Sequence, residues 1–190
     1  PTGYHFRKLL EGFEDIVKII TVAPELEGAP DLIKMASDMG IVVSMGHSDA
    51  SYGEAEEGFH AGARGITHLF NAMRLFHHRE PGIAGFGLLN PHIYAEIIAD
   101  PYHLHPETLR LIFTLKNPEK IIIVSDAIKA TLLSSEDRVI TDETGTLMGG
   151  STTISASAKR LIEMGFQEEL IMPCIGINPA SYLFLEQRVR

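Results

Sequence analysis

The sequence predicts an α/β protein of the (β/α)8 TIM-barrel type, present as a partial barrel of about five strands with their helices. Two observations lead to this prediction. Short runs rich in Ile and Val alternate with helical segments, which is typical of a parallel sheet covered by helices. Residues that could bind a metal or transfer a proton follow at least four of these runs. An open doubly wound sheet fits the alternation equally well, but chemistry at several strand ends suits a barrel mouth better.

The predicted strands are apolar runs bounded by turn residues. They lie at residues 19–23, 41–45, 65–69, 94–99 and 121–125. A complete barrel has eight strands and typically about 250 residues, whereas this chain has 190. We therefore expect residues 1–190 to be the larger, C-terminal part of a barrel domain, and the first residue, Pro1, agrees with a piece of a longer chain.

Helical periodicity appears between most of these strands. Residues 31–38 carry apolar side chains near helical spacing, and Tyr52, Ala55 and Phe59 form an apolar face opposite a group of glutamates. Pro106 suits the first turn of another helix. The remaining predicted elements are an opening amphipathic helix, a hairpin or loop insertion at 139–148, and helices at 157–164 and from 167 onward.

Composition limits the classes of function. Hydrophobic residues make up 45% of the chain, which favours a compact globular protein. The formal net charge of −9 argues against a nucleic-acid partner, because phosphate binding relies on clustered Lys and Arg. No apolar run is long enough for a bilayer, and the single cysteine, Cys174, cannot form an internal disulfide. We expect a reduced, soluble, cytoplasmic protein with no membrane partner.

Four strand-end residues are candidates for chemistry. His47 and His68 follow consecutive strands, and Glu25 follows the preceding one, which gives a mixed nitrogen and oxygen donor set suited to zinc or iron(II). Asp126 ends the last strand, where a carboxylate can take a proton from an attacking water; the alternative interpretation is a helix cap. Three other histidines lack such a context and are expected at the surface: His5, His60 and His92.

Several ordered motifs together resemble one family. They are Ala23-Pro24-Glu25, Gly46-His47-Ser48, Thr67-His68-Leu69-Phe70-Asn71-Ala72-Met73, Arg79-Glu80-Pro81-Gly82, Ile98-Ala99-Asp100 with His103, and Ser125-Asp126-Ala127. The chain is similar, over most of its length, to the N-acetylglucosamine-6-phosphate deacetylase family of the amidohydrolase superfamily. The resemblance implies that Glu25, His47 and His68 bind at least one divalent transition metal, zinc or iron(II), and that Asp126 is the general acid and base.

The resemblance also implies a substrate site. His103 is expected to contact the sugar or the reacting carbonyl, Asn71 and Ala72 to hold the phosphosugar, and Arg79 to bind the phosphate across a dimer interface. Two plainer interpretations stay open: Asn71 as turn chemistry, and Arg79 as a surface ion pair with Glu80.

The expected reaction is hydrolysis of the acetamide of N-acetyl-D-glucosamine 6-phosphate to D-glucosamine 6-phosphate and acetate, in amino-sugar catabolism. The implied partners are the phosphosugar and a second copy of the full-length protein, and the family's small β-sandwich domain is not expected here. Two alternatives are another hydrolase of the superfamily, acting on a cyclic or acylated amide, and a non-catalytic phosphosugar-binding barrel fragment.

Overall fold

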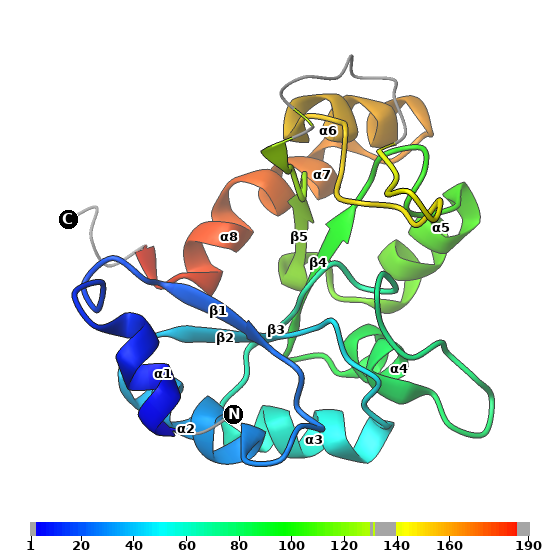
Figure 1. The fold of residues 1–190 in the computed structure, drawn as a ribbon. Helices are drawn as coiled ribbons and strands as arrows, with labels where there is room; N and C mark the ends of the chain where they lie inside the picture. The colour runs from blue at the N-terminus through cyan, green and yellow to red at the C-terminus, as the bar shows by residue number, and fades with distance from the viewer. Residues whose placement is uncertain (1–2, 130, 132–139, 186–190) are drawn as a thin grey trace. The chain divides into compact units, whose positions relative to one another are not determined.

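The computed structural model describes residues 3–129, 131 and 140–185 (Figure 1). The chain divides into two compact units. The first comprises Pro1–Ala95 with Ala180–Arg190, and the second comprises Glu96–Pro179. In the part of the chain that the structure describes, no helix combines the length and the apolar character needed to cross a membrane.

Parallel strands form the centre of the first unit. Strand β1 (Ile19–Val22) pairs with β2 (Val42–Met45), which pairs with β3 (Gly65–Ile66). Strand β3 then pairs with the start of β4 (Tyr94–Ile98), which continues into the second unit, and β5 (Ile121–Val124) follows it in the strand order β1-β2-β3-β4-β5. This order confirms the predicted parallel sheet.

The predicted strand at 65–69 is shorter than expected. Strand β3 ends at Ile66, because the backbone turns into the left-handed region at His68, with φ of 35°. The other four strands agree with their predicted ranges to within one residue at each end. The chain therefore leaves the sheet just before His68, the residue predicted to bind metal.

In the described part of the first unit, four helices lie wholly within it: α1 (Gly3–Leu10), α2 (Ala29–Asp38), α3 (Tyr52–Ala61) and α4 (Gly82–Leu89). Helices α2 and α3 lie side by side along one face of β1 and β2 (Figure 1). Helix α3 begins at a capping box, in which the Ser51 side chain accepts from the backbone N–H of Glu54 and the Glu54 carboxylate accepts from that of Ser51.

Helix α4 was not predicted from the sequence. Its eight residues, GIAGFGLL, include three glycines, which lower helix propensity, and seven are buried, so no polar face marks the helical period. A Cβ at Gly87 would lie 2.8 Å from Ile66 Cγ1. Glycine therefore lets α4 pack closely against the end of β3. The same glycines remove the sequence pattern by which a helix is predicted.

The second unit contains α5 (Pro106–Leu115), the 3-10 turn η1 (Pro118–Lys120), α6 (Ile154–Glu163) and α7 (Glu168–Ile175). Helix α7 packs against β5 and η1. The last helix, α8 (Ile177–Tyr182), starts in this unit and ends in the first. The predicted hairpin is present over 140–148, where Thr141 and Leu147 form an antiparallel bridge; Val139 lies outside the described residues.

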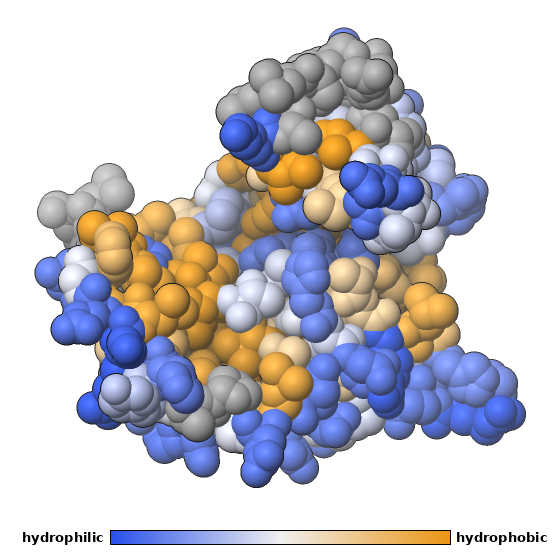
Figure 2. Space-filling model, in the orientation of Figure 1, coloured by the Kyte–Doolittle hydropathy of each residue, from blue (hydrophilic) through white to orange (hydrophobic). Residues whose placement is uncertain are grey.

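An apolar surface extends over α1 and β1 of the first unit (Figure 2). Leu9, Phe13, Ile16, Ile19 and Leu26 are all exposed there. Strand β1 is the first strand of the sheet, and its side chains are exposed or half-buried, unlike the fully buried side chains of β2. Strands of parallel sheets are normally covered on both faces, so β1 is less covered than its neighbours.

Candidate active site

Left-handed backbone marks the strand ends of the predicted site. His47 after β2, His68 after β3 and Asp126 after β5 have φ of 48°, 35° and 48°. Six described non-glycine residues have positive φ, and four of them, Ala72 included, are predicted site residues. Such a conformation costs of order 1–3 kcal/mol for a residue other than glycine and is concentrated at functional sites. Left-handed backbone is therefore concentrated at residues that the sequence analysis placed in the site.

The two histidines meet through their outer ring nitrogens. Nε2 of His47 lies 2.8 Å from Nε2 of His68, and the rings meet edge to face at 75°. His68 is buried whereas His47 is exposed. Two imidazole nitrogens on one tetrahedral zinc ion would be about 3.3 Å apart, since each Zn–N bond is about 2.0–2.1 Å. The observed separation is that of a hydrogen bond between the rings and is shorter by about 0.5 Å, so the two nitrogens already lie near the spacing that a shared ion requires.

The third predicted ligand, Glu25, is held by the loop that follows His47. Its carboxylate accepts from the Ser48 hydroxyl at 2.6 Å and from the backbone N–H of Asp49 at 2.8 Å. Ser48 Oγ in turn accepts from the N–H of Ala50 at 3.0 Å, which fixes its direction. Among the described residues, no three His, Cys, Asp or Glu side chains are grouped closely enough to hold a metal. The structure thus pairs the two histidines and fixes Glu25 on the adjoining loop.

The strands beneath these ligands are linked by a row of hydroxyl groups. Thr67 Oγ1 donates to Ser44 Oγ at 2.7 Å and lies 3.0 Å from Thr21 Oγ1, so the row crosses β1, β2 and the end of β3. Ser44 is buried and Thr67 half-buried, so their hydroxyls need partners, and they find them in one another and in the exposed Thr21. The row holds in register the strands whose ends carry Glu25, His47 and His68.

The two residues expected to hold the phosphosugar lie in the turn after His68. Asn71 Nδ2 donates to the carbonyl oxygens of His68 and Leu69, at 3.2 and 3.3 Å, so its amide closes the turn, as the plainer interpretation expected. The carbonyl oxygen of the exposed Ala72 accepts from the N–H of Ser48 at 3.2 Å. This turn is therefore joined to the loop that holds Glu25.

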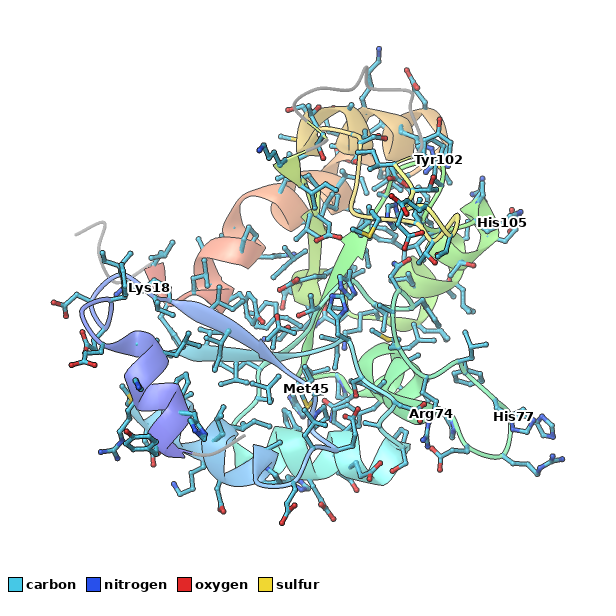
Figure 3. All side chains as sticks on the ribbon, in the orientation of Figure 1. Lys18, Met45, Arg74, His77, Tyr102 and His105 are labelled. Carbon is cyan, nitrogen blue, oxygen red and sulfur yellow. The ribbon has the colours of Figure 1, made fainter. Side chains whose placement is uncertain are left out.

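A loop at residues 74–80 carries Arg79 and is anchored at both ends. At its start, Arg74 forms a two-point ion pair with Asp49, with both nitrogen–oxygen distances at 2.9 Å. At its end, Glu80 Oε1 accepts from the backbone N–H of Tyr52 at 2.8 Å and of Gly82 at 3.0 Å. Figure 3 shows Arg74 at the base of the loop and His77 at its outer end. Sequence reasoning missed Arg74 and Asp49, because residues 25 positions apart carry no shared pattern.

The contacts at the two ends of this loop lower the pKa values of the carboxyl groups of Asp49 and Glu80. The hydrogen bond and charge of Arg74 hold the pKa of Asp49 below its usual value. The pKa of Glu80 is also lowered, because the N–H groups of Tyr52 and Gly82 donate to its charged form. Both carboxylates are therefore charged at neutral pH and remain available as anchors.

Arg79 itself is exposed. Its Nη1 lies 3.2 Å from His78 Nε2, and its backbone N–H donates to His77 Nδ1 at 3.3 Å. Among the described side chains, no ion pair joins Arg79 to Glu80, since Glu80 bonds to backbone N–H groups instead. The surface ion pair considered from the sequence is therefore not formed. His5, His60 and His92 are exposed, as predicted.

Asp126 occupies the end of β5 in the second unit. The residue is exposed, and its carbonyl oxygen accepts from the N–H of Gly150 at 2.9 Å. A Cβ at Gly150 would overlap the carbonyl oxygen of Ser125, so only glycine permits this close approach. The backbone of residues 149–150 therefore supports the strand end that presents Asp126. Among the described residues that follow, the N–H of Ile128 donates to Thr131 Oγ1. The rest of the segment that the helix-cap interpretation concerns, residues 130 and 132–139, lies outside the described residues.

His103 lies in the turn after β4 in the same unit, and Asp100 holds it. Asp100 Oδ2 lies 2.7 Å from His103 Nδ1, and both side chains are buried. Asp100 Oδ1 accepts from the N–H groups of Tyr102 and His103, each at 2.8 Å. Asp100 follows a predicted strand directly and belongs to one of the motifs that carry the family resemblance, but no role was predicted for it.

Comparisons with known proteins agree on one group of relatives. No protein-family model matches the chain. The N-acetylglucosamine-6-phosphate deacetylase of Bos taurus is 36% identical over 92% of this chain and 47% of the relative. The N-acetylgalactosamine-6-phosphate deacetylase of Escherichia coli O157:H7 is 31% identical over 94% of this chain and 48% of the relative. The chain thus spans about half the length of the curated relatives it matches.

Solved structures extend this likeness to the fold. A structure of a mutant N-acetyl-D-glucosamine-6-phosphate deacetylase from Mycobacterium smegmatis, in complex with N-acetyl-D-glucosamine-6-phosphate, matches with a TM-score of 0.87 and 28% identity. The match covers 97% of this chain and 53% of that chain. It confirms the predicted fold class, a partial (β/α)8 barrel with five parallel strands.

Proposed function

We propose that the chain belongs to the N-acetylglucosamine-6-phosphate deacetylase family and serves in the metal-dependent hydrolysis of N-acetyl-D-glucosamine 6-phosphate to D-glucosamine 6-phosphate and acetate, as its likeness to these relatives supports. The observation that carries the proposal is the pairing of His47 and His68 through Nε2 at the ends of neighbouring strands. Residues 1–190 are proposed to be the larger, C-terminal part of the catalytic barrel. The apolar surface along β1 supports this placement, since further chain of a complete barrel would cover it.

The proposed metal ligands are Glu25, His47 and His68. The close Nε2 atoms and the fixed carboxylate give the mixed donor set that zinc and iron(II) accept. When bound, the metal supplies Lewis acidity, which lowers the pKa of water toward neutrality and polarises the amide carbonyl. Ser48 and Asp49 orient the Glu25 carboxylate, as outer partners of ligands commonly do.

Asp126 is the proposed general acid and base. Its exposed carboxylate would accept a proton from the attacking water as the carbon–oxygen bond forms, and would return that proton to the departing amine as the carbon–nitrogen bond breaks. A tetrahedral intermediate separates the two steps. The same group thus serves both halves of the reaction, and no net proton is gained or lost by the protein.

The remaining predicted residues are proposed to bind the substrate. Asn71, Ala72 and His103 would contact the sugar and its acetamide, and Arg79 would bind the phosphate of a substrate held by a second copy of the protein. The exposure of Arg79 on the anchored loop supports a contact of this kind. We place the reaction in the cytoplasm, because the single cysteine, Cys174, is a buried free thiol, as is usual in reducing compartments.

The proposal is tested by measuring acetate release from N-acetyl-D-glucosamine 6-phosphate, its galactose epimer and the unphosphorylated sugar. We expect the phosphorylated glucosamine derivative to be the best substrate. Preference for the epimer would instead assign the protein the substrate named for the relative from Escherichia coli O157:H7. Binding of the phosphosugar without acetate release from any substrate, in protein shown to contain metal, would favour the non-catalytic alternative.

The phosphate role of Arg79 gives a prediction on substrate affinity. Arg79→Ala should raise KM for the 6-phosphorylated sugar about 10- to 100-fold, because a charge-assisted guanidinium–phosphate contact is worth about 1.5–3 kcal/mol. KM for the unphosphorylated sugar should change little. Arg7→Ala, at an exposed position of α1, is the matched control. Equal losses on both sugars would remove Arg79 from the phosphate site.

A further inference from the structure

We propose that Asp100 is a positioning residue that holds His103 as the Nδ1–H tautomer, so that Nε2 accepts a hydrogen bond from a hydroxyl or amide N–H of the sugar substrate. The proposal rests on the proposed function only in naming that substrate. It starts from a contact that the reaction described above does not use, the 2.7 Å approach of Asp100 Oδ2 to His103 Nδ1.

The first step concerns which atom carries the proton. Burial raises the pKa of Asp100, but the hydrogen bonds from the His103 ring and from the N–H groups of His103 and Tyr102 outweigh it, and the pKa is lowered overall. Asp100 is therefore an ionised carboxylate at neutral pH. An ionised carboxylate only accepts hydrogen bonds, so the proton in the contact belongs to His103 Nδ1. In a neutral imidazole, Nε2 is then an acceptor.

The second step concerns how firmly the pair is held. Asp100 Oδ1 accepts two backbone N–H groups of its own turn, at 2.8 Å each, which fixes the carboxylate plane. Nη1 of Arg160, on α6, donates to the carbonyl oxygens of Ala99 and Asp100 at 3.0 Å each, which fixes the strand end. These bonds together hold the Asp100 carboxylate, its turn and the end of β4 in one arrangement. The His103 ring is therefore held in a single orientation.

The decisive change is Asp100→Asn, which keeps size and turn but inverts the hydrogen bond to the ring. The amide oxygen must face the two backbone N–H groups, because an NH2 there would oppose two donors. The amide NH2 then faces His103 Nδ1 and donates to it, which forces the proton to Nε2. We expect kcat/KM to fall at least about 10- to 100-fold, the range typical when a carboxylate that orients a metal-bound histidine is removed.

Two measurements separate positioning from a structural role. Nitrogen-15 NMR of histidine-labelled protein at neutral pH should show a protonated Nδ1 and an unprotonated Nε2 for His103, and the reverse in Asp100→Asn. In a His103→Gln background, Asp100→Asn should lower kcat/KM no further, because its effect acts through the ring. Asp142→Asn is the matched control, since Asp142 Oδ1 likewise accepts turn N–H groups, without a histidine.

Failure of the positioning role and failure of the proposed reaction give different results. A proton on Nε2 in the parent protein, or a further loss of the same size in the His103→Gln background, would overturn the positioning role. If the parent releases no acetate but carries the Nδ1 proton, the reaction is wrong and the tautomer assignment stands.

Discussion

Asp126→Asn should lower kcat about 10⁴-fold or more while leaving metal content and KM near the parental values. Asparagine keeps the size of the side chain but cannot accept the proton of the attacking water or return one to the amine. General acid–base catalysis usually contributes about 10²–10⁴-fold, and a residue that serves both half-steps should reach the upper end. The substitution adds no backbone strain at this left-handed position, because Asn adopts positive φ as readily as Asp.

The competing interpretation of Asp126 predicts a different result. As a helix cap, Asn would replace Asp with almost no effect. Steady-state kinetics and metal analysis of Asp126→Asn, beside Asp38→Asn at an exposed position of α2, separate the two. Near-parental kcat in the metal-loaded variant would discard the proposed acid–base role.

Removal of either paired histidine should abolish stable metal binding. We expect about one transition metal per chain in the parent protein, and its retention through dialysis should be lost in His47→Ala and in His68→Ala. Changes to outer partners of ligands already cost about 10–100-fold in metal affinity, so loss of a direct ligand should cost more. Metal content is measured by elemental analysis after dialysis against a competing chelator.

Backbone strain needs its own control in this experiment, because both histidines have positive φ and alanine does not favour it. His47→Asn and His68→Asn keep a residue that tolerates this backbone and should also lose the metal. His60→Ala, at an exposed position of α3, should keep it. Full metal content in folded His47 and His68 variants would place the metal elsewhere.

Much of the fold follows from the sequence alone. The five strands could be located because apolar β-branched runs end at turn residues, and a buried parallel sheet demands such runs. Helices with a polar face, such as α3, were equally predictable from the helical period. Helix α4 was not, because it is buried almost all round and its glycines serve the close approach to Ile66 rather than helix formation.

The sequence by itself determined which residues end the strands, and so it identified His47, His68 and Asp126 as candidates. Only the tertiary structure decided how they are held. The Ser48–Glu25 and Arg74–Asp49 contacts join residues 23 and 25 positions apart, and even the local Asp100–His103 contact depends on a turn that brings the two side chains together. Periodicity reports which face of an element is buried. It carries no information on the sign of φ at the end of a strand, or on which loops contact one another. Both are set by the packing of whole elements.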